Sequence, residues 1–277
     1  MGELVIAAVP LGNVGDATDR LKAAIQSADV IAAEDSRRFH RLCKDLDLEP
    51  HAKVISFFEG NENERIQELR NLLSGSANVL LVTDAGMPTV SDPGYRAIRL
   101  AIDEGFPFRI LPGPSAVTMA LALSGLPTDR FCFEGFAPKT KGARQRYFEE
   151  IVHETRTLIF FEAPHRVREF ILDARGAFGP DRRGAICREM TKIYEETVRG
   201  NLDELYIWSA GKEMLGEFTI VIEGFNSGSI SQSDDEIAAL VRRYESSGIT
   251  RKEAIGMVAK EMKIPKRKVF DIMIENK

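Results

Sequence analysis

The first 115 residues alternate short apolar runs with amphipathic segments, and this alternation restricts the fold more than any other feature of the sequence. Five runs of strand length are rich in Val, Ile or Phe: residues 4–9, 30–33, 54–58, 79–82 and 108–111. Between them lie helical patterns, such as residues 62–73 and a helix that Asp16 is placed to cap. Because alternating strands and helices pack as a mostly parallel sheet covered on both faces, we predict an α/β domain over residues 1–113.

A second set of elements follows with a different pattern. Strands are predicted at residues 131–136, 157–161, 185–188 and 218–222, and helices at 142–153 and 164–178. Short spacings after Met190 indicate hairpins, so we predict a mixed sheet in a second α/β domain, residues 114–225. Pro112, Gly113, Pro114 and Ser115 form the domain junction.

The C-terminal region reads as a separate helical module. Residues 226–233 are a polar linker by composition, and residues 234–277 contain three short amphipathic helices. Thr250 is placed to cap the second of these helices, and Pro265 falls in the first turn of the third. The short turns between short helices predict a small module that resembles a helix-turn-helix.

Composition excludes several protein classes. Apolar residues make up 44% and charged residues 29%, which argues against wholesale disorder. The 42 Asp and Glu residues outnumber the 37 Lys and Arg residues, so the chain can bind nucleic acid only through local basic patches. Three widely separated cysteines favour a reducing compartment over a disulfide framework or a zinc site. With no signal sequence and no apolar run near 20 residues, we expect a soluble cytoplasmic protein without a membrane segment.

Three loops follow predicted strands and carry the glycines and prolines of ligand sites. The loop at residues 9–16 holds Gly12 and Gly15 but lacks the third glycine of a dinucleotide-binding fingerprint, so by itself it is equally a tight turn. The loop at residues 83–94 is longer than a plain connection needs, and a ligand role is favoured for it. In that loop Asp84 is suited to ribose hydroxyls or a cationic cofactor. Residues 111–116 form either a ligand-facing helix start or a rigid hinge.

Charged clusters follow three further predicted strands, at residues 34–38, 160–166 and 188–196. Each alone is more simply a solvated ion-pair cluster, and His165 alone is more simply a hydrogen-bonded residue at a helix start. Their repetition at equivalent strand ends favours a catalytic edge. No His, Cys and Asp group has the spacing of metal ligands, so no metal site is predicted.

Two regions are locally basic. Lys139, Lys141, Arg144 and Arg146 fall within eight residues that contain no acid. The tail from residue 231 holds ten Lys and Arg residues against eight Asp and Glu residues. Each region is either a phosphate-binding patch or a solubilising surface.

Taken in order, seven motifs resemble the ribosomal RNA small subunit methyltransferase I family of the tetrapyrrole methylase superfamily. They are Val-Pro-Leu-Gly-Asn from residue 9, Ala-Glu-Asp-Ser-Arg from 33, Thr-Asp-Ala-Gly-Met-Pro from 83, Pro-Gly-Pro-Ser-Ala from 112, Phe-Glu-Ala-Pro-His-Arg from 161, Arg-Glu-Met-Thr-Lys from 188 and Gly-Glu-Phe-Thr from 216. The resemblance spans residues 3–225, and the helical tail also fits. Ser36 departs from the threonine more usual in relatives. Asp84-Ala85-Gly86 differs from the Gly-Asp-Pro of enzymes that act on small tetrapyrroles, which favours the RNA-modifying branch.

The resemblance implies S-adenosylmethionine, bound in a cleft between two α/β domains, and methylation of a cytidine ribose 2′-hydroxyl in the decoding region of 16S rRNA. The partner is then the small ribosomal subunit, and the family usually works as a homodimer. By position in the motifs, the implied cofactor contacts are Leu11, Gly12, Asp84, Ala85, Gly86, Met87, Pro88, Ser115, Ala116, Ala163 and Glu217.

The clusters at the strand ends suggest the remaining roles. We predict that Asp35 or Glu189 accepts the proton of the ribose hydroxyl, with Lys192 beside them at the catalytic centre. Residues predicted to bind RNA are Arg37, Lys139, Lys141, Arg144, His165, Arg166 and Arg188. Two other functions stay open at this point: methylation of a small tetrapyrrole, and a non-catalytic RNA-binding role at the ribosome.

Overall fold

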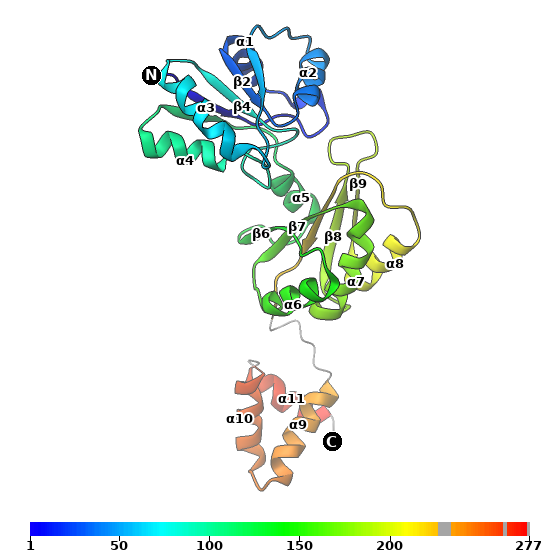
Figure 1. Cartoon of the computed structure of the whole chain (residues 1–277). Coiled ribbons are helices and arrows are strands. Elements are labelled where there is room, and N and C mark those ends of the chain that lie inside the picture. The colour runs from blue at the N-terminus through cyan, green and yellow to red at the C-terminus, as the bar shows by residue number, and fades with distance from the viewer. Residues whose placement is uncertain (227–233, 263–264, 276–277) are drawn as a thin grey trace. The chain divides into compact units, whose positions relative to one another are not determined.

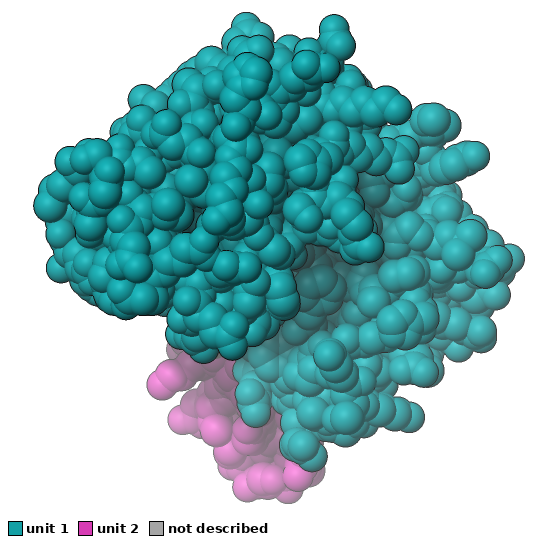
Figure 2. Space-filling view, turned by 45° about the horizontal axis from the view of Figure 1, so that its top comes forward, with its two compact units in different colours: residues 1–152, 156–223 teal, residues 153–155, 224–277 magenta. Residues whose placement is uncertain are grey.

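The structure is a computed structural model that describes residues 1–226, 234–262 and 265–275. Contacts divide it into two units, residues 1–152 with 156–223 and residues 153–155 with 224–277, coloured separately in Figure 2. Apart from residues 153–155 and 224–225, both predicted α/β domains fall within the first unit, so the boundary near residue 113 stays a prediction. The predicted linker, residues 226–233, lies outside the described residues apart from Asn226.

The first sheet is entirely parallel, as the strand–helix alternation predicts. Its strands run in the order β3-β2-β4-β1-β5 and comprise β1 (Leu4–Ala7), β2 (Val30–Ala33), β3 (Lys53–Ser56), β4 (Val79–Val82) and β5 (Phe108–Leu111). In the register, Ile6 lies opposite Leu81 on one side and Ile110 on the other. All five carboxyl ends therefore meet at one edge of the sheet.

Helices cover both faces of this sheet because neighbouring side chains on a strand point to opposite sides. Leu4 and Ile6 pack with helices α3 (Glu62–Ser74) and α4 (Tyr95–Glu104). Val5 and Ala7 pack with α1 (Asp19–Ser27) and α2 (Ser36–Asp45). Figure 1 shows the two helix layers on either side of the strands.

The first helix begins later than predicted. Thr18 caps α1, and its side chain accepts a hydrogen bond from the Leu21 backbone N–H at 3.1 Å. Asp16 instead ends a short 3₁₀ turn, η1 (Val14–Asp16), which Asn13 caps. The prediction that Asp16 caps the helix is therefore wrong, because the chain makes this extra turn before the helix starts.

The second sheet is mixed, as predicted. Its order is β6-β7-β10-β8-β9, with β6 (Phe131–Phe136), β7 (Thr157–Glu162), β8 (Arg183–Arg188), β9 (Glu196–Asn201) and β10 (Phe218–Ile222). Strands β6 and β7 are parallel, and the other neighbours are antiparallel.

Helices also cover both faces of the second sheet. One face carries α6 (Lys141–Ile151), α7 (Val167–Phe178), which follows the 3₁₀ turn η2 (Pro164–Arg166), and α8 (Leu202–Ala210). The other face carries α5 (Ala116–Ser124). Because α5 starts five residues after the end of β5, one carboxyl end of the first sheet is tied directly to the second sheet.

The second unit is a three-helix bundle: α9 (Asp234–Ser246), α10 (Arg251–Glu261) and α11 (Lys266–Glu275). Val241, Val258 and Val269 contribute one fully buried side chain from each helix. Thr250 caps α10 as predicted, in a reciprocal capping box with Glu253. In the described part of the chain, no helix is both long and apolar enough to cross a membrane.

Candidate active site

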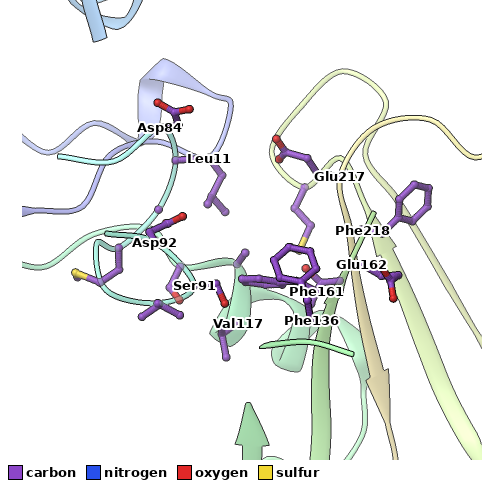
Figure 3. A pocket seen from close by; sticks show the side chains of 18 of the residues that line it. Leu11, Asp84, Ser91, Asp92, Val117, Phe136, Phe161, Glu162, Glu217 and Phe218 are labelled. Carbon is purple, nitrogen blue, oxygen red and sulfur yellow. The ribbon is translucent and has the colours of Figure 1, made fainter. Parts of the chain in front are cut away.

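A cavity of about 410 Å³ lies at the carboxyl edge of the first sheet. One wall comes from the segments after β1, β2, β4 and β5, and the other from the ends of β6, β7, β8 and β10 (Figure 3). The lining residues are Leu11, Glu34, Arg38, Asp84, Ala85, Gly86, Met87, Val90, Ser91, Asp92, Ser115, Ala116, Val117, Phe136, Phe161, Glu162, Ala163, Pro164, Met190, Gly216, Glu217, Phe218 and Thr219. Open α/β sheets bind ligands at this edge.

The loop between β4 and α4 is held in a tightly defined shape. Gly86, with φ of 74°, exchanges two backbone hydrogen bonds with Val9. Thr89 and Ser91 also have positive φ, of 78° and 61°. Such strained backbone persists only where surrounding contacts fix it, and it concentrates at ligand sites.

The end of this loop is anchored by a buried carboxylate from a distant helix. Glu62 of α3 accepts hydrogen bonds from the backbone N–H groups of Gly94 and Arg96, both at 3.2 Å. Gly94 has no side chain with which to cap α4, so Glu62 supplies the missing acceptor. The residues just before Gly94, including Asp92, are fixed against the pocket as a result.

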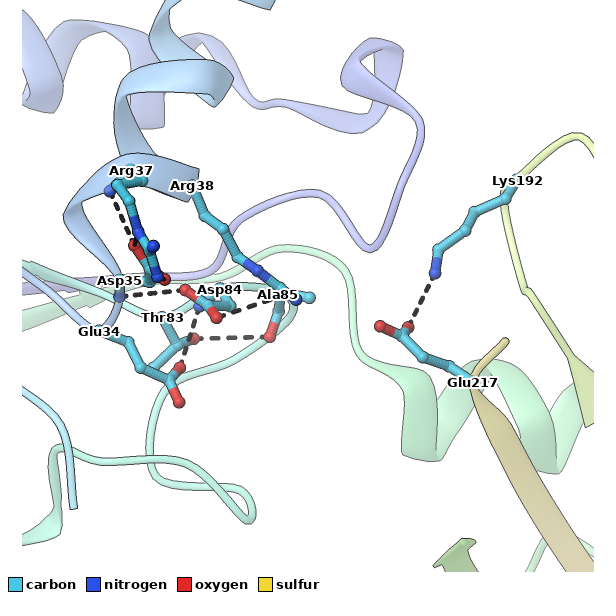
Figure 4. A network of polar contacts seen from close by, with 9 residues as sticks. All are labelled: Glu34, Asp35, Arg37, Arg38, Thr83, Asp84, Ala85, Lys192 and Glu217. Atoms are coloured by element: carbon cyan, nitrogen blue, oxygen red, sulfur yellow. Dashed lines mark hydrogen bonds and ion pairs between the residues drawn. The ribbon is translucent and has the colours of Figure 1, made fainter. Parts of the chain in front are cut away.

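Two of the pocket carboxylates are tied together after β2 and β4 (Figure 4). Glu34 accepts a hydrogen bond from the Asp84 N–H, and Asp84 accepts one from the Asp35 N–H, both at 3.1 Å. Arg38 also lies 3.4 Å from Asp84. Burial raises the pKa of Glu34 and of Asp84, and the like charges around them add to this rise.

Asp92 differs from the other pocket carboxylates. In the described structure it has no hydrogen-bond or ion-pair partner, whereas the remaining four, Glu34, Asp84, Glu162 and Glu217, each have at least one. Burial, together with the charges of Glu34, Asp84 and Glu217, raises the pKa of Asp92 to about 7. A carboxyl group with such a pKa exchanges protons near neutral pH.

The opposite wall is held by a lysine bridged between two carboxylates. Lys192 Nζ lies 2.9 Å from Glu189 and 3.0 Å from Glu217, and Glu189 also accepts the Glu217 N–H at 2.9 Å. Burial by itself disfavours the charged form of both groups. The hydrogen bonds and opposite charges of the Lys192–Glu189–Glu217 cluster outweigh this effect, so the pKa of Lys192 is raised and the pKa of Glu189 is lowered. Figure 4 shows Lys192 and Glu217 facing the Asp84 network.

The loop that carries Lys192 also touches the loop after β1. The Asn13 N–H donates to Thr191 Oγ1 at 3.2 Å. A Cβ on Gly12 would lie 2.4 Å from Lys192 Cγ, so only glycine lets the two loops approach this closely. Gly12 thus positions the opposite wall although it does not line the cavity.

An aromatic and apolar surface separates the acidic groups. Phe161 packs edge-on against Phe133 and Phe136, with ring centroids 4.8 and 5.9 Å apart. Phe136 is 56% exposed at the cavity, and Met190 adds a thioether to the wall. Such a surface suits a flat ring system.

The structure brings most of the cofactor residues expected from the sequence motifs to this cavity. Leu11, Asp84, Ala85, Gly86, Met87, Ser115, Ala116, Ala163 and Glu217 line it. Gly12 and Pro88 do not. The cavity is also lined by Glu34, Arg38, Asp92, Phe136 and Phe161, which the motifs do not identify one by one although all five lie in predicted strands or in the segments that follow them.

The predicted catalytic residues lie outside the cavity lining. Asp35 caps α2, and its carboxylate binds Arg37 at 2.8 Å. The hydrogen bonds from Arg37 hold the pKa of Asp35 far below its usual range, which makes Asp35 a weak proton acceptor. Glu189 is likewise held in its charged form by Lys192.

Among the predicted RNA-binding residues, Arg144 is wrongly assigned. Its side chain is 1% exposed, its Nε donates to Asp173 at 2.8 Å, and its Nη2 lies 2.6 Å from the same carboxylate. A guanidinium group buried in an ion pair cannot contact RNA phosphates. The local count of charges missed this partner because Asp173 lies on α7, 29 residues away.

Two other arginines are committed to backbone carbonyl groups. Arg166 donates to Ala137 O at 2.8 Å and Pro138 O at 3.0 Å, and Arg188 donates to Leu215 O at 2.6 Å. Both hold loops around the cavity. Arg37, Lys139, Lys141 and His165 are exposed.

Comparisons with known proteins agree with this geometry. A family model for tetrapyrrole (corrin/porphyrin) methylases matches residues 3–206. Ribosomal RNA small subunit methyltransferase I of Mycobacterium tuberculosis is 44% identical over 277 residues, which cover 100% of this chain and 96% of that protein. The protein of the same name from Thermotoga maritima is 40% identical over 224 residues, covering 81% of this chain and 99% of that one.

A solved structure shares the fold. Uroporphyrin-III C-methyltransferase from Thermus thermophilus, complexed with S-adenosylhomocysteine, aligns with a TM-score of 0.55 and 17% sequence identity. The alignment covers 80% of this chain and 97% of that chain.

Proposed function

The chain belongs to the tetrapyrrole methylase family, in its ribosomal RNA small subunit methyltransferase I branch, and from that membership we propose that it methylates RNA of the small ribosomal subunit with S-adenosylmethionine as donor. The family resemblance seen in the seven sequence motifs is thereby confirmed. For the acceptor we propose the 2′-hydroxyl of a cytidine in the decoding region of 16S rRNA. The observation that carries the proposal is the acidic cavity between the two sheet edges.

The cavity fits such a donor in size and charge. Its volume of about 410 Å³ lies within the range of small-molecule sites, roughly 300–1,000 Å³. Five carboxyl groups line it against one guanidinium group, that of Arg38, among the described residues. S-adenosylmethionine supplies an electrophilic methyl group on a positively charged sulfur. Glu34, Asp84, Asp92 and Glu217 would hold that charge, and Phe161 offers a flat apolar surface.

We assign proton acceptance to Asp92. In the transfer, the ribose oxygen forms a bond to the methyl carbon, the carbon–sulfur bond breaks, and the hydroxyl proton moves to the carboxylate. Glu34 accepts an N–H group, Asp84 accepts an N–H group and lies beside Arg38, and Glu217 is paired with Lys192, so each of these three carboxylates already has a partner. Among the described residues Asp92 has no such partner. Its pKa is raised to about 7, and the positively charged sulfur of a donor bound beside it would lower that pKa and favour the carboxylate form that accepts the proton.

RNA is expected to approach over the end of β6. Phe136 is exposed at the cavity, and Lys139 and Lys141 follow it within five residues. An exposed aromatic ring beside cationic side chains suits a flipped-out base and its flanking phosphates. Arg146, one turn further along α6, is also exposed.

The double variant Lys139→Gln/Lys141→Gln should weaken RNA binding while leaving donor affinity unchanged. The logarithm of the binding constant falls linearly with the logarithm of the salt concentration. For single-stranded RNA each lost phosphate contact lowers the magnitude of this salt slope by about 0.7, so we expect a reduction of about 1.4. Filter binding of 16S rRNA at several salt concentrations measures this slope. The control Lys44→Gln/Lys53→Gln removes two exposed lysines that do not line the cavity. Equal slopes for the two double variants would remove Lys139 and Lys141 from the RNA path.

Incubation with methyl-labelled donor tests the proposed function. We expect label in 16S rRNA of undermodified small subunits, and 2′-O-methylcytidine after nuclease digestion. Label in a free tetrapyrrole but not in RNA would identify a small-molecule methylase. RNA binding without any transfer would identify a non-catalytic binding protein.

The protein is also proposed to act as a homodimer in the cytoplasm, as the family resemblance implies. The apolar side chains of Ile193, Tyr194 and Leu215 are strongly exposed in the loops near Lys192, which supports a protein contact there. Sedimentation should give about twice the chain mass of 30.9 kDa. A single-chain mass at micromolar concentration would contradict the dimer.

A further inference from the structure

The three-helix unit carries a basic groove of its own, between α10 and α11. Five basic residues line it, namely Arg251, Lys252, Lys260, Lys266 and Arg267. Glu253 is the one acidic residue in the described lining. Its carboxylate is engaged in the Thr250 capping box, and the two hydrogen bonds from Thr250 lower its pKa. The groove is therefore far more basic than the chain as a whole.

Four of the five cations are available for a ligand. Arg251 donates to Met273 O at 3.0 Å and lies 3.8 Å from Glu245, so it is partly committed within the bundle. Among the described residues, Lys252, Lys260, Lys266 and Arg267 have no hydrogen-bond or ion-pair partner, and all four are exposed. Four unpaired cations in one groove match a polyanion rather than an isolated carboxylate.

A glycine shapes the bottom of the groove. Lys266 Nζ lies 3.4 Å from the position that a Cβ would take at Gly256 on α10. The missing side chain allows the ammonium group of α11 to lie against the neighbouring helix. The cationic surface therefore continues from one helix to the other.

Exposed apolar side chains lie in the same groove. Phe270 is 53% exposed and Met257 is 42% exposed, and both line the groove together with the lysines. An exposed aromatic ring flanked by unpaired cations is the arrangement that binds single-stranded nucleic acid, because bases stack on the ring while cations contact phosphates.

We propose that the α10–α11 groove binds a single-stranded RNA segment, with phosphates on Lys252, Lys260, Lys266 and Arg267 and a base stacked on Phe270. Given the proposed function, this segment belongs to RNA of the small ribosomal subunit. The groove and the catalytic cavity lie in different units of the chain, so the groove supplies a second anchor on the same substrate. Two anchors joined in one chain raise the overall affinity above that of either.

The full-length variant Lys260→Gln/Lys266→Gln tests the electrostatic part. Its control is Arg243→Gln/Lys268→Gln, which removes two exposed cations of the same unit outside the groove. The probe is a fluorescein-labelled single-stranded RNA of mixed sequence, titrated from 50 to 200 mM salt. Loss of two phosphate contacts should lower the salt slope by about 1.4 in the groove variant. The control should retain the wild-type slope.

Phe270→Leu tests the stacking part. It should weaken binding of the same probe roughly fivefold or more, because loss of a base–aromatic stack has about this effect. The control Ile274→Ala changes another exposed apolar residue of α11 that does not line the groove, and it should bind as wild type does. Equal loss in both variants would overturn the stacking contact.

The outcomes separate this inference from the proposed function, because methylation of small subunits by the wild-type protein is measured alongside. If the wild-type protein methylates small subunits and the groove and control variants bind the RNA probe equally well, the groove proposal is wrong and the proposed function stands. If only the groove variant binds the RNA probe more weakly and the wild-type protein methylates nothing, the groove proposal stands and the proposed function is wrong. If the groove variant loses binding to small subunits but not to the RNA probe, the occupant is a ribosomal protein and the RNA assignment is wrong.

Discussion

Asp92→Asn should lower the rate of methyl transfer about 10²- to 10⁴-fold while S-adenosylmethionine still binds. The substitution keeps the shape of the side chain but removes the proton acceptor, and positioned general bases contribute about this factor. Single-turnover transfer to small subunits at saturating donor measures the effect. Asp35→Asn is the control, because Asp35 caps α2 outside the cavity lining, and its transfer rate should stay close to that of the wild type.

The same substitution should stabilise the fold at alkaline pH. Burial and the neighbouring carboxylates raise the pKa of Asp92 from its usual range to about 7 in the folded protein, so the wild-type fold loses stability as the pH rises toward and through 7. At pH 8 we expect the free energy of unfolding of Asp92→Asn to exceed that of the wild type by about 1–2 kcal/mol. This value is smaller than the pKa shift alone would give, because Asp92 is partly exposed to water. Near pH 4 the difference should disappear.

Urea unfolding at pH 4 and pH 8 checks this second effect. A variant that is inactive and more stable at pH 8 fits a strained catalytic carboxylate. A variant that transfers methyl groups at the wild-type rate would show that another group accepts the proton.

Arg144→Met should cost about 3–5 kcal/mol in the free energy of unfolding. The substitution leaves the carboxylate of Asp173 buried without its guanidinium partner, and an uncompensated buried charge has this penalty. The double variant Arg144→Met/Asp173→Leu should recover much of the loss, since both charges are then absent. Urea unfolding at pH 7 measures all the variants.

Arg146→Met is the matched control on the same helix. Arg146 is exposed, so its replacement should change stability by less than about 0.5 kcal/mol. If Arg144→Met kept full stability and bound RNA weakly, the buried ion pair would be an incorrect description and Arg144 would belong to the RNA surface after all.

The segments that line one wall of the cavity could be predicted because topology places them, whereas their role toward a cofactor follows from the family resemblance. Leu11, Asp84 and Ser115 follow strands β1, β4 and β5, and parallel strands bring their carboxyl ends to one edge. Short apolar runs bounded by Gly, Pro or Asp identify those strands without knowledge of tertiary contacts. The sequence therefore contains the location of the cavity.

Elements with weak periodicity were not predicted. Helix α2 begins at Ser36 directly after its cap, Asp35, but six of its ten side chains are charged or histidine, and its two buried residues, Phe39 and Cys43, give little apolar pattern. Local pattern therefore indicates only a charged cluster at this place. Strand β9 likewise alternates weakly, and its pairing with β8 fixes it instead.

Roles that depend on distant partners were also beyond local pattern. Arg144 looks like surface charge until α7 brings Asp173 against it. Asp92 lies in a loop that the sequence marks as functional, yet its lack of partners depends on how Glu62 anchors the loop and on which N–H groups the neighbouring carboxylates accept. Three-dimensional contacts decide which charges are engaged and which are free.

Calorimetric titration of S-adenosylmethionine into wild-type protein and two cavity-filling variants, Ala116→Phe and Ala163→Phe, tests the central claim most directly. We predict one binding site per chain in the wild type, with affinity that rises with pH through about 7 as Asp92 ionises, and no binding in the filled variants. Gly142→Ala, where an added Cβ meets nothing within 4 Å, should bind normally. Folded wild-type protein that takes up no donor, or filled variants that bind it as well as wild type, would contradict the account.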